Sequence, residues 1–464
     1  MINSDPALTP ADLVPATRRL WEVSGPKILS IDASDIPGGA TPVFTVEGKY
    51  TARGWTEWTQ GFVYGSALLQ FDATGDERFL ELGRTRTRER MAHHITHVGV
   101  HDHGFNNVST YGNLLRLMHE GRIEENPRER DFYELALKCS GAVQAARWTS
   151  IAGGGGFIHS FNGPHSLFAD TIRSLRALAA AHSLGHVLMG EKDTRISLLG
   201  RLIDHAKATA EYAVYYGKGR DAYDLRGRVA HESVFNLNDG SYRCPNSQQG
   251  YSPFTTWTRG LAWIVAGYPE QVEWLATLED GGFEPFGGRA AVEGMMLDAA
   301  RAACDFYIDH TPTDGIPYWD TGAPLLHRLG HYLDQPARIH NDFEPVDSSA
   351  AAIAAQGLLR LGRLLGESGE GRRYWQAGLT TAKTVFSDAY LSTDSGHQGL
   401  ILHSIYHRPN GWDYIPPGSK IPLGESSMWG DYHARELALL IDRLAGGGYY
   451  TFFHQDQNTA HRKS

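Results

Sequence analysis

The stretch that decides the fold is Thr74-Gly75-Asp76-Glu77-Arg78-Phe79, which joins two segments with helical spacing of apolar residues. Its glycine stands where the first helix would end, and its two acidic residues stand where the second would begin. Glycine readily adopts the left-handed conformation that ends many helices, and acidic side chains stabilise a helix N-terminus. The stretch 190–194, Gly-Glu-Lys-Asp-Thr, has the same order. Both predict a hairpin of two helices as the unit of the fold.

Helical spacing of apolar residues recurs along most of the chain. It is found in the segments 56–73, 78–97, 130–149, 166–186, 194–216, 255–268, 289–310, 347–366, 370–388 and 426–445. Strand-like alternation is scarce, and the connections are rich in Gly, Pro, Asp and Asn, as expected of turns. No fixed repeat of about 20 to 50 residues is visible, which favours a closed helical toroid over a solenoid. An irregular all-α domain is the alternative.

The helical pattern continues from about residue 10 to residue 445 without a low-complexity linker. We therefore expect one catalytic domain, 1–445, with a short N-terminal extension. The last residues, 446–464, are rich in Gly and then polar, and we expect them to leave the core as a tail.

Composition excludes several classes of protein. The net charge is -10, with 53 acidic and 43 basic residues and no long basic run, which argues against nucleic acid or an anionic membrane as a partner. The chain lacks the roughly 20 consecutive apolar residues of a membrane helix, and its three cysteines are far apart in sequence. Neither a disulfide framework nor a CxxC metal site is indicated. We expect a cytoplasmic protein, a monomer or homodimer.

Two acidic residues are the first candidates for catalysis. Asp102 lies in His101-Asp102-His103-Gly104-Phe105, where a helix is expected to turn into a loop. Asp170 lies in an apolar stretch with helical spacing, where an unpaired carboxylate costs several kcal/mol. A raised pKa would suit Asp170 to general acid catalysis. The structural alternatives are that Asp102 caps a helix and that Asp170 pairs with Arg173 or Arg176.

Aromatic residues indicate what such acids would act on. Trp257 and Trp263 flank Arg259, and Gln249 lies a few residues upstream. Indole rings, a guanidinium and an amide together suit a sugar with a carboxylate and hydroxyl groups. Two core tryptophans and a salt-bridged arginine are an equal alternative.

Metal and cofactor sites are not expected. His93, His97 and His101 are spaced by four residues, but the helix is expected to end before His101, and no Cys or Glu completes a ligand set. The run of four glycines at 153–156 lacks the Lys-Ser/Thr of a phosphate-binding loop.

Taken together, these motifs resemble the unsaturated glucuronyl hydrolases, glycoside hydrolase family 88, and more distantly the unsaturated rhamnogalacturonyl hydrolases. The matching stretches occur in family order over roughly residues 50 to 445. They are Trp58-Thr-Gln-Gly-Phe, His101-Asp-His-Gly-Phe, Asp170, His205-Ala, Asp239-Gly-Ser, Gln249-Gly-Tyr-Ser, Trp257-Thr-Arg-Gly-Leu-Ala-Trp, Asp314-Gly-Ile-Pro-Tyr-Trp-Asp, Asp347-Ser-Ser-Ala-Ala and Gly430-Asp-Tyr.

The resemblance implies an (α/α)6 barrel that removes a 4,5-unsaturated uronic acid from the non-reducing end of oligosaccharides made by polysaccharide lyases. Asp170 would be the general acid/base, protonating C4 and activating the water that attacks C5, and Asp102 would support it. The family's pattern assigns substrate binding to Trp58, His101, His205, Gln249, Trp257, Arg259 and Trp263, with Arg259 available to the uronate carboxylate. No cofactor is implied.

Two other functions remain open on the same barrel. A sugar epimerase or isomerase is one, since His205 with another histidine could move protons. A carbohydrate-binding protein without activity is the other, because the residues around Asp170, Phe-Ala-Asp-Thr-Ile-Arg-Ser-Leu, depart from the family's usual pattern.

Overall fold

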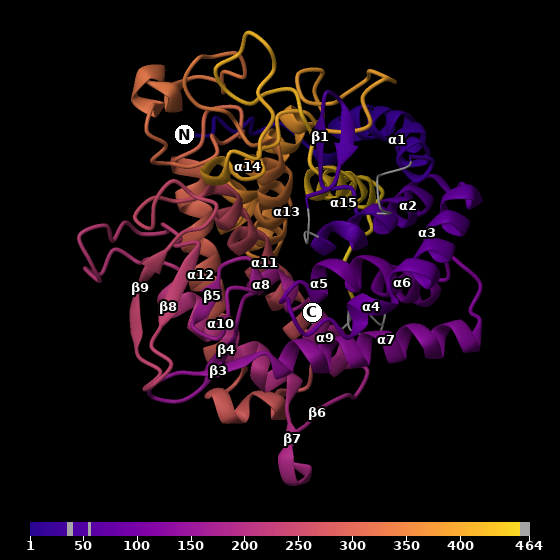
Figure 1. Ribbon diagram of the computed structural model, residues 1–464, viewed down its shortest axis with the longest axis vertical. Helices are drawn as coiled ribbons and strands as arrows, with labels where there is room; N and C mark the ends of the chain where they lie inside the picture. Colours follow the sequence, from indigo (N-terminus) through magenta and orange to yellow (C-terminus); the bar gives the residue numbers. More distant parts are fainter. Residues whose placement is uncertain (35–39, 54–56, 455–464) are drawn as a thin grey trace.

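Six helical segments form a closed inner ring in the computed structural model, which describes residues 1–34, 40–53 and 57–454 (Figure 1). Each segment contacts the next around the ring, and the last contacts the first. In ring order they are α2 (Gln60–Thr74), α5 (His103–Asn106) continued by η3 (Val108–Gly112) and α6 (Asn113–His119), α8 (Thr171–Ser174) with α9 (Arg176–Ser183), α11 (Thr258–Leu275), α13 (Ser348–Leu364) and α15 (Met428–Ala445).

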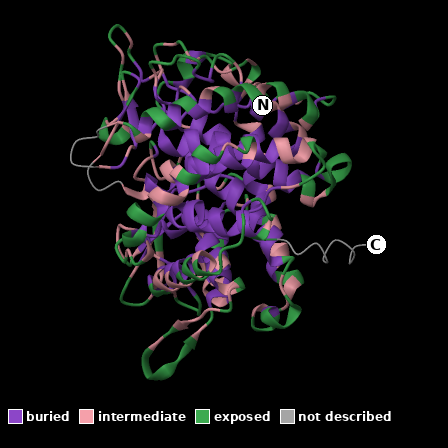
Figure 2. Ribbon diagram, turned by 90° about the vertical axis from the view of Figure 1, so that its right-hand side faces the viewer, coloured by how far each residue is buried: buried purple, intermediate pink, exposed green. Residues whose placement is uncertain are grey.

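Six helices cover this ring from outside. They are α1 (Pro10–Asp32), α3 (Glu77–Arg90), α7 (Pro127–Ala146), α10 (Leu198–Tyr212), α12 (Arg289–Asp309) and α14 (Arg372–Val385). Buried residues concentrate in the inner helices, while exposed residues lie on the loops and the outer surface (Figure 2). The described residues thus form an (α/α)6 barrel, which confirms the predicted fold.

The connections between helices carry short strands and single helical turns. The strands are β1 (Phe44–Val46), β2 (Lys49–Thr51), β3 (Trp148–Ser150), β4 (Gly156–Ile158), β5 (Ser166–Phe168), β6 (Leu188–Met189), β7 (Arg195–Ile196), β8 (Glu232–Phe235) and β9 (Tyr242–Asn246), and they pair antiparallel. The turns are η2 (Glu57–Thr59), α4 (Ala92–Ile95), η4 (Glu191–Asp193), η5 (Asp280–Phe286), η6 (Leu326–Leu329), η7 (Tyr332–Asp334), η8 (Gly366–Glu370) and η9 (Arg408–Asn410).

The stretch 74–79 forms the predicted junction. Gly75 ends α2 in the left-handed conformation, with φ of 72°, and the Asp76 side chain caps α3 by accepting a hydrogen bond from the Arg78 backbone N–H. The stretch 190–194 does not form one, because it lies in the exposed turn of the β6–β7 hairpin, where Lys192 and Asp193 have positive φ. That prediction was wrong.

Close packing of α11 against α13 supports the inner ring. Gly357 of α13 lies against the backbone of Val265, and a Cβ there would come within 2.0 Å of the Val265 carbonyl oxygen. The alanine-rich start of α13 is fully buried, and Asp347 caps it by accepting hydrogen bonds from two backbone N–H groups. The small residues after Asp347 therefore serve helix packing.

Three expectations about chain segments need correction. Residues 166–168 are strand β5, paired with β8, so the helix expected over 166–186 starts only after Asp170. Helix α1 was missed, because Pro15 and Pro26 within it argue against a helix, yet its apolar face is buried in the core.

The third correction concerns the end of the chain. Residues 446–453 do not leave the core: Tyr450 and Phe452 are buried, and the Tyr449 and Tyr450 hydroxyls donate hydrogen bonds to Glu273 and Glu436. Their aromatic rings remove more apolar surface from water than a polar tail would. The rest of the predicted tail, 455–464, lies outside the described residues. No helix in the described ranges is both long and apolar enough to span a membrane.

Candidate active site

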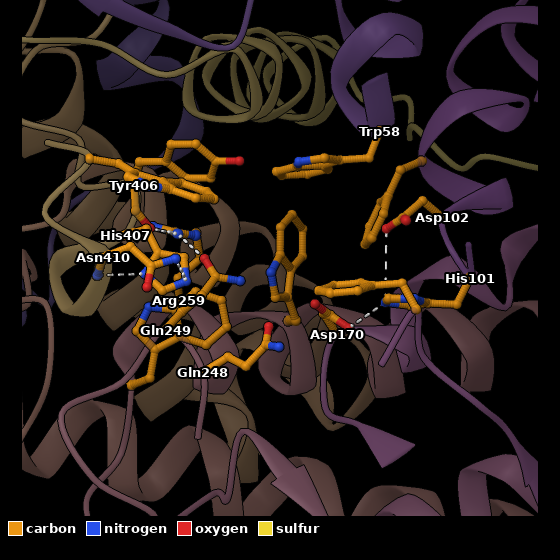
Figure 3. A pocket seen from close by; sticks show the side chains of 15 residues that line it. Trp58, His101, Asp102, Asp170, Gln248, Gln249, Arg259, Tyr406, His407 and Asn410 are labelled. Carbon is orange, nitrogen blue, oxygen red and sulfur yellow. Dashed lines mark hydrogen bonds and ion pairs between the residues drawn. The ribbon is translucent and has the colours of Figure 1, made fainter. Parts of the chain in front are cut away.

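A pocket opens at the end of the barrel where the inner helices begin (Figure 3). Trp58, in η2 just before α2, and Arg259 and Trp263, in the first turns of α11, contribute to it. The lining residues are Trp58, His101, Asp102, Phe105, Phe161, Asp170, Gln248, Gln249, Trp257, Arg259, Trp263, Tyr406, His407, Asn410 and Trp412. All but one of the predicted site residues are therefore brought together; the exception is His205.

The two candidate acids share one histidine. Nε2 of His101 lies 3.1 Å from Oδ1 of Asp170 and 3.8 Å from Oδ1 of Asp102. All three residues are at most 9% exposed, and their side chains form one wall of the pocket (Figure 3). This arrangement holds an imidazole between two carboxylates at the edge of an aromatic cavity.

The three groups shift one another's pKa values in different directions. Burial lowers the pKa of His101, but the charges of Asp102 and Asp170 outweigh burial and raise it. Burial raises the pKa of Asp102, against the charge of His101. Burial also acts to raise the pKa of Asp170, but the charge of His101 and the hydrogen bond from it prevail, and the pKa is lowered. The expected raised pKa of Asp170 was wrong for the free protein, because His101 stabilises its ionised form.

Asp170 is held at the junction of a strand and a helix. It follows β5 and precedes α8, yet its side chain makes no capping hydrogen bond to that helix. Arg173 pairs with Glu270 and Glu436, and Arg176 pairs with Glu436, so neither arginine forms the ion pair with Asp170 that the structural alternative required. The carboxylate is consequently directed to His101 and the pocket.

Asp102 has a similar position before α5, and it also makes no capping hydrogen bond to its helix. Gly104 allows α5 to approach α8 closely, since a Cβ at this position would lie 2.1 Å from the Ser174 carbonyl oxygen. The Ser174 hydroxyl donates a hydrogen bond to the His101 carbonyl oxygen. The Gly-Phe context of Asp102 thus brings the two acid-bearing segments together.

Arg259 is salt-bridged, as the structural alternative in the sequence analysis held. Its guanidinium lies between the rings of Trp257 and Trp429, at 4.7 and 4.8 Å. It donates hydrogen bonds to Asp347 at 2.8 Å and to Gln249 Oε1 at 2.9 Å. Because the partner carboxylate is also buried, Arg259 forms a compensated ion pair that orients Gln249.

The three predicted tryptophans line the pocket to different extents. Trp58 is half-buried and stacks on Trp429, with ring centroids 5.1 Å apart. Trp257 and Trp263 are only 3% and 2% exposed. Trp58 therefore offers the largest free indole face for a sugar ring, while the other two serve mainly as packing.

His205 does not reach the pocket, which corrects its predicted role. Its Nδ1 accepts a hydrogen bond from the Ile158 backbone N–H, its Nε2 lies 3.2 Å from the Thr209 hydroxyl, and the side chain is fully buried. These bonds fix the inner end of β4 against α10. The prediction failed because a histidine among apolar residues gives no signal of which cavity it faces.

His231 shapes the pocket, and the sequence did not single it out. Its Nδ1 accepts hydrogen bonds from the backbone N–H groups of Gln248 and Gln249, at 3.0 and 3.3 Å. Burial lowers its pKa to about 3, so the ring is neutral and can act as an acceptor. His231 thereby positions both pocket glutamines.

The segment 406–412 supplies four lining residues that the sequence did not single out. Asp413 holds this segment by accepting hydrogen bonds from the Tyr406 and His407 backbone N–H groups. The motif Arg-Pro-Asn-Gly at 408–411 indicated only a turn. Because this segment is far in sequence from Asp102 and Asp170, no local pattern indicated that it shares a site with them.

A metal site is poorly supported by the histidines. His101 lies in the pocket, away from the group formed by Glu57, His93 and His94, whose ligand atoms lie within 4.8 Å of one another. Both ring nitrogens of His94 already contact amide side chains, at 2.7 Å to Gln60 and 3.1 Å to Asn106. A metal ion at His94 would have to displace one of them.

No protein-family model matches the chain. The chain is 26% identical over 417 residues to an unsaturated glucuronyl hydrolase of Bacillus sp. (strain GL1), covering 87% of this chain and 90% of the relative. It is 23% identical over 407 residues to an unsaturated chondroitin disaccharide hydrolase of Streptococcus pyogenes serotype M1, covering 85% and 84%.

Solved structures agree with these relatives. The unsaturated glucuronyl hydrolase of Bacillus sp. GL1 superposes with a TM-score of 0.70 at 22% identity, covering 95% of this chain and 99% of that one. An unsaturated glucuronyl hydrolase specific for heparin gives a TM-score of 0.69 at 19% identity, covering 94% and 99%. These matches confirm the fold. In sequence, the chain is similar over most of its length to unsaturated glucuronyl hydrolases and unsaturated chondroitin disaccharide hydrolases.

Proposed function

We propose that the enzyme removes a 4,5-unsaturated uronic acid from the non-reducing end of lyase-generated oligosaccharides, with Asp170 as the general acid/base. The observation that carries this proposal is the placement of His101 in one wall of an aromatic pocket, hydrogen-bonded to Asp170 and 3.8 Å from Asp102. The named activities of the relatives, on unsaturated glucuronyl and unsaturated chondroitin substrates, support the substrate class.

The pocket suits a uronic acid in two respects. The N-terminal end of α11 carries partial positive charge, which favours a bound carboxylate. Trp58 offers an indole face to a sugar ring, and Gln249, held by Arg259, offers an amide to its hydroxyl groups. The Arg259 charge is balanced by Asp347, so its proposed part is to orient Gln249 at the uronate.

The proton would reach Asp170 from His101. In the free enzyme the proton rests on His101, whose pKa is raised, while the pKa of Asp170 is lowered. A bound substrate excludes water and adds a carboxylate, and both effects raise the pKa of Asp170. The proton then moves from His101 Nε2 to Asp170 across the 3.1 Å hydrogen bond.

Hydration of the double bond follows. Asp170 donates its proton to C4, and the C4=C5 pair forms the new C–H bond, leaving an oxocarbenium ion at C5. The Asp170 carboxylate then takes a proton from water, whose oxygen bonds to C5. The resulting hemiketal opens to a ketone at C5, and the hemiacetal exposed at C1 releases the rest of the chain. Asp102 would stabilise His101 throughout.

The test is turnover of unsaturated uronyl oligosaccharides prepared with lyases from several uronic acid polymers. We expect loss of the ultraviolet absorbance of the double bond and, by mass spectrometry, a 4-deoxy keto sugar with a chain shortened by one residue. Asp170→Asn should lower kcat by about 100-fold or more. Asp76→Asn, at an exposed helix cap, is the matched control.

Three results would contradict the proposal. Unchanged absorbance across the panel would exclude the hydrolase, and a product of unchanged chain length would indicate an isomerase. A full rate in Asp170→Asn would exclude Asp170 as the acid/base. Saturable binding without turnover would indicate a binding protein.

A further inference from the structure

The helix that carries Asp170 into the pocket is only four residues long. Helix α8, Thr171–Ser174, is fully buried, and Leu175, whose backbone is still right-handed helical, joins it to α9. Even together the two helices span only residues 171–183, and isolated helices shorter than about 12 to 15 residues are marginal in water, so this segment depends on tertiary contacts. The position of Asp170 is therefore set by what the α8 side chains bind.

Arg173 provides the strongest of these contacts. Its Nε and one terminal nitrogen donate to the two carboxylate oxygens of Glu270, at 2.7 and 2.8 Å. The same terminal nitrogen lies 2.8 Å from a Glu436 oxygen. Glu270 belongs to α11 and Glu436 to α15, so one arginine ties α8 to two helices of the inner ring. A planar guanidinium fixes the directions of these hydrogen bonds more strictly than an ammonium group would.

Close backbone contacts hold α8 from both sides. A Cβ on Gly104 of α5 would lie 2.1 Å from the Ser174 carbonyl oxygen, and one on Gly267 of α11 would lie 2.7 Å from an Ile172 methyl carbon. Side chains larger than hydrogen do not fit at either place. Helix α8 can therefore shift only if the ion pairs of Arg173 with Glu270 and Glu436 break.

These charged anchors are shielded from water. The side chains of Arg173, Glu270 and Glu436 are at most 2% exposed. The Tyr450 hydroxyl of the C-terminal segment donates a 3.0 Å hydrogen bond to Glu436. Because water is excluded, the geometry of the ion pairs is more strongly constrained than on a surface.

We propose that Arg173, held by Glu270 and Glu436, is a positioning residue that fixes Asp170 against His101. The proposal rests on the acid/base role given to Asp170 above. It assigns a task to a charged cluster that does not touch the pocket, and it connects the inner helices α11 and α15 to the proton-transfer geometry.

The test compares Glu270→Gln with Glu273→Gln. Both glutamates are on α11 and both are buried. Glu270 pairs with Arg173 of α8 at 2.7 Å and lies 3.8 Å from Arg360 of α13, whereas Glu273 pairs with Arg360 at 2.6 Å and not with α8. We expect Glu270→Gln to lower kcat by about tenfold. KM should stay nearly unchanged, because Trp58 and Gln249 are on other elements. Glu273→Gln should keep the wild-type kcat, although both variants lose stability.

Hydrogen exchange provides a second readout that does not need turnover. In α8 the Arg173 and Leu175 backbone N–H groups donate to Asp170 and Thr171. Glu270→Gln should speed exchange at residues 170–175, and Glu273→Gln should not. Equal kcat in the two variants, or unchanged exchange at 170–175 in Glu270→Gln, would overturn the proposal. If the wild type turns over no substrate, the proposed function fails, while the exchange data still decide whether the network positions α8.

Discussion

Nε2 of His101 lies 3.1 Å from Oδ1 of Asp170, although the two residues are 69 positions apart in sequence. This bond explains why the pKa values of two neighbouring buried carboxylates move in opposite directions. Asp170 receives the hydrogen bond, and its pKa is lowered despite burial. Asp102 lies 3.8 Å from the same nitrogen, and burial prevails in raising its pKa. The different distances of the two carboxylates from His101 thus account for their opposite pKa shifts.

Asp102→Asn should move the alkaline limb of the pH profile of kcat/KM to lower pH. Burial lowers the pKa of His101, and the charge of Asp102 is the largest of the effects that oppose it. Without that charge His101 loses its proton at a lower pH, and the supply of protons to Asp170 ends earlier. Profiles of the wild type and of Asp76→Asn provide the reference. An unchanged alkaline limb would show that His101 does not supply the proton.

Asp320→Asn should flatten the dependence of stability on pH. Burial raises the pKa of Asp320 from 3.8 to about 6, and its oxygens accept hydrogen bonds from the Tyr251 and Gly322 backbone N–H groups. Because the folded pKa is the higher one, its contribution is complete below about pH 4 and is lost as pH rises through about 6. The loss is about 3 kcal/mol.

Urea unfolding at about pH 4 and about pH 7 measures this difference. The wild type should lose more free energy of unfolding between the two values than Asp320→Asn does. Equal slopes in the two proteins would mean that the Asp320 pKa is ordinary in the folded state.

The sequence predicted the ring of helices because their apolar faces and caps are local signals. Gly75 and Asp76 act as expected at the α2–α3 junction. The same type of signal misled at 190–194, since glycine and acidic residues also suit an exposed hairpin turn. Helix α1 escaped prediction because burial of its apolar face in the core outweighs two internal prolines, and that contact is not local.

The acid-bearing part of the site was also predictable, but its electrostatics were not. An acid in an apolar stretch signals burial, and burial alone would raise the pKa of Asp170. The opposite shift comes from His101, whose distance from Asp170 depends on the packing of α5 against α8. For the same reason the ion pair of Arg259 was only one of two alternatives in the sequence, because its partner Asp347 is 88 residues away.

Replacing His205 and His231 by leucine should separate a structural histidine from one that shapes the pocket. Each accepts a hydrogen bond from buried backbone N–H groups, so each variant should lose about 1–3 kcal/mol of stability. Only His231→Leu should raise KM, by about five- to tenfold, because it releases the Gln248 and Gln249 backbone. Chemical unfolding and steady-state kinetics measure the two effects. A raised KM in His205→Leu would restore its predicted role in substrate binding.

Asp347→Asn should destabilise the protein strongly while preserving a helix cap. Asp347 accepts hydrogen bonds from the Ser349 and Ala350 backbone N–H groups at the start of α13, and asparagine is an equally good cap. The loss would therefore come from its buried ion pair with Arg259, whose N–O distance is 2.8 Å and whose side chains are at most 1% exposed. Leaving the guanidinium charge uncompensated costs about 3–5 kcal/mol.

Urea unfolding of this variant beside Asp76→Asn provides the comparison, because Asp76 caps α3 at the surface and its arginine partner, Arg78, is exposed. Asp76→Asn should unfold close to the wild type, since exposed ion pairs contribute little. A similar small loss in Asp347→Asn would mean that the Arg259 charge is compensated by the pocket itself. The guanidinium would then be available to a substrate carboxylate, as the sequence first suggested.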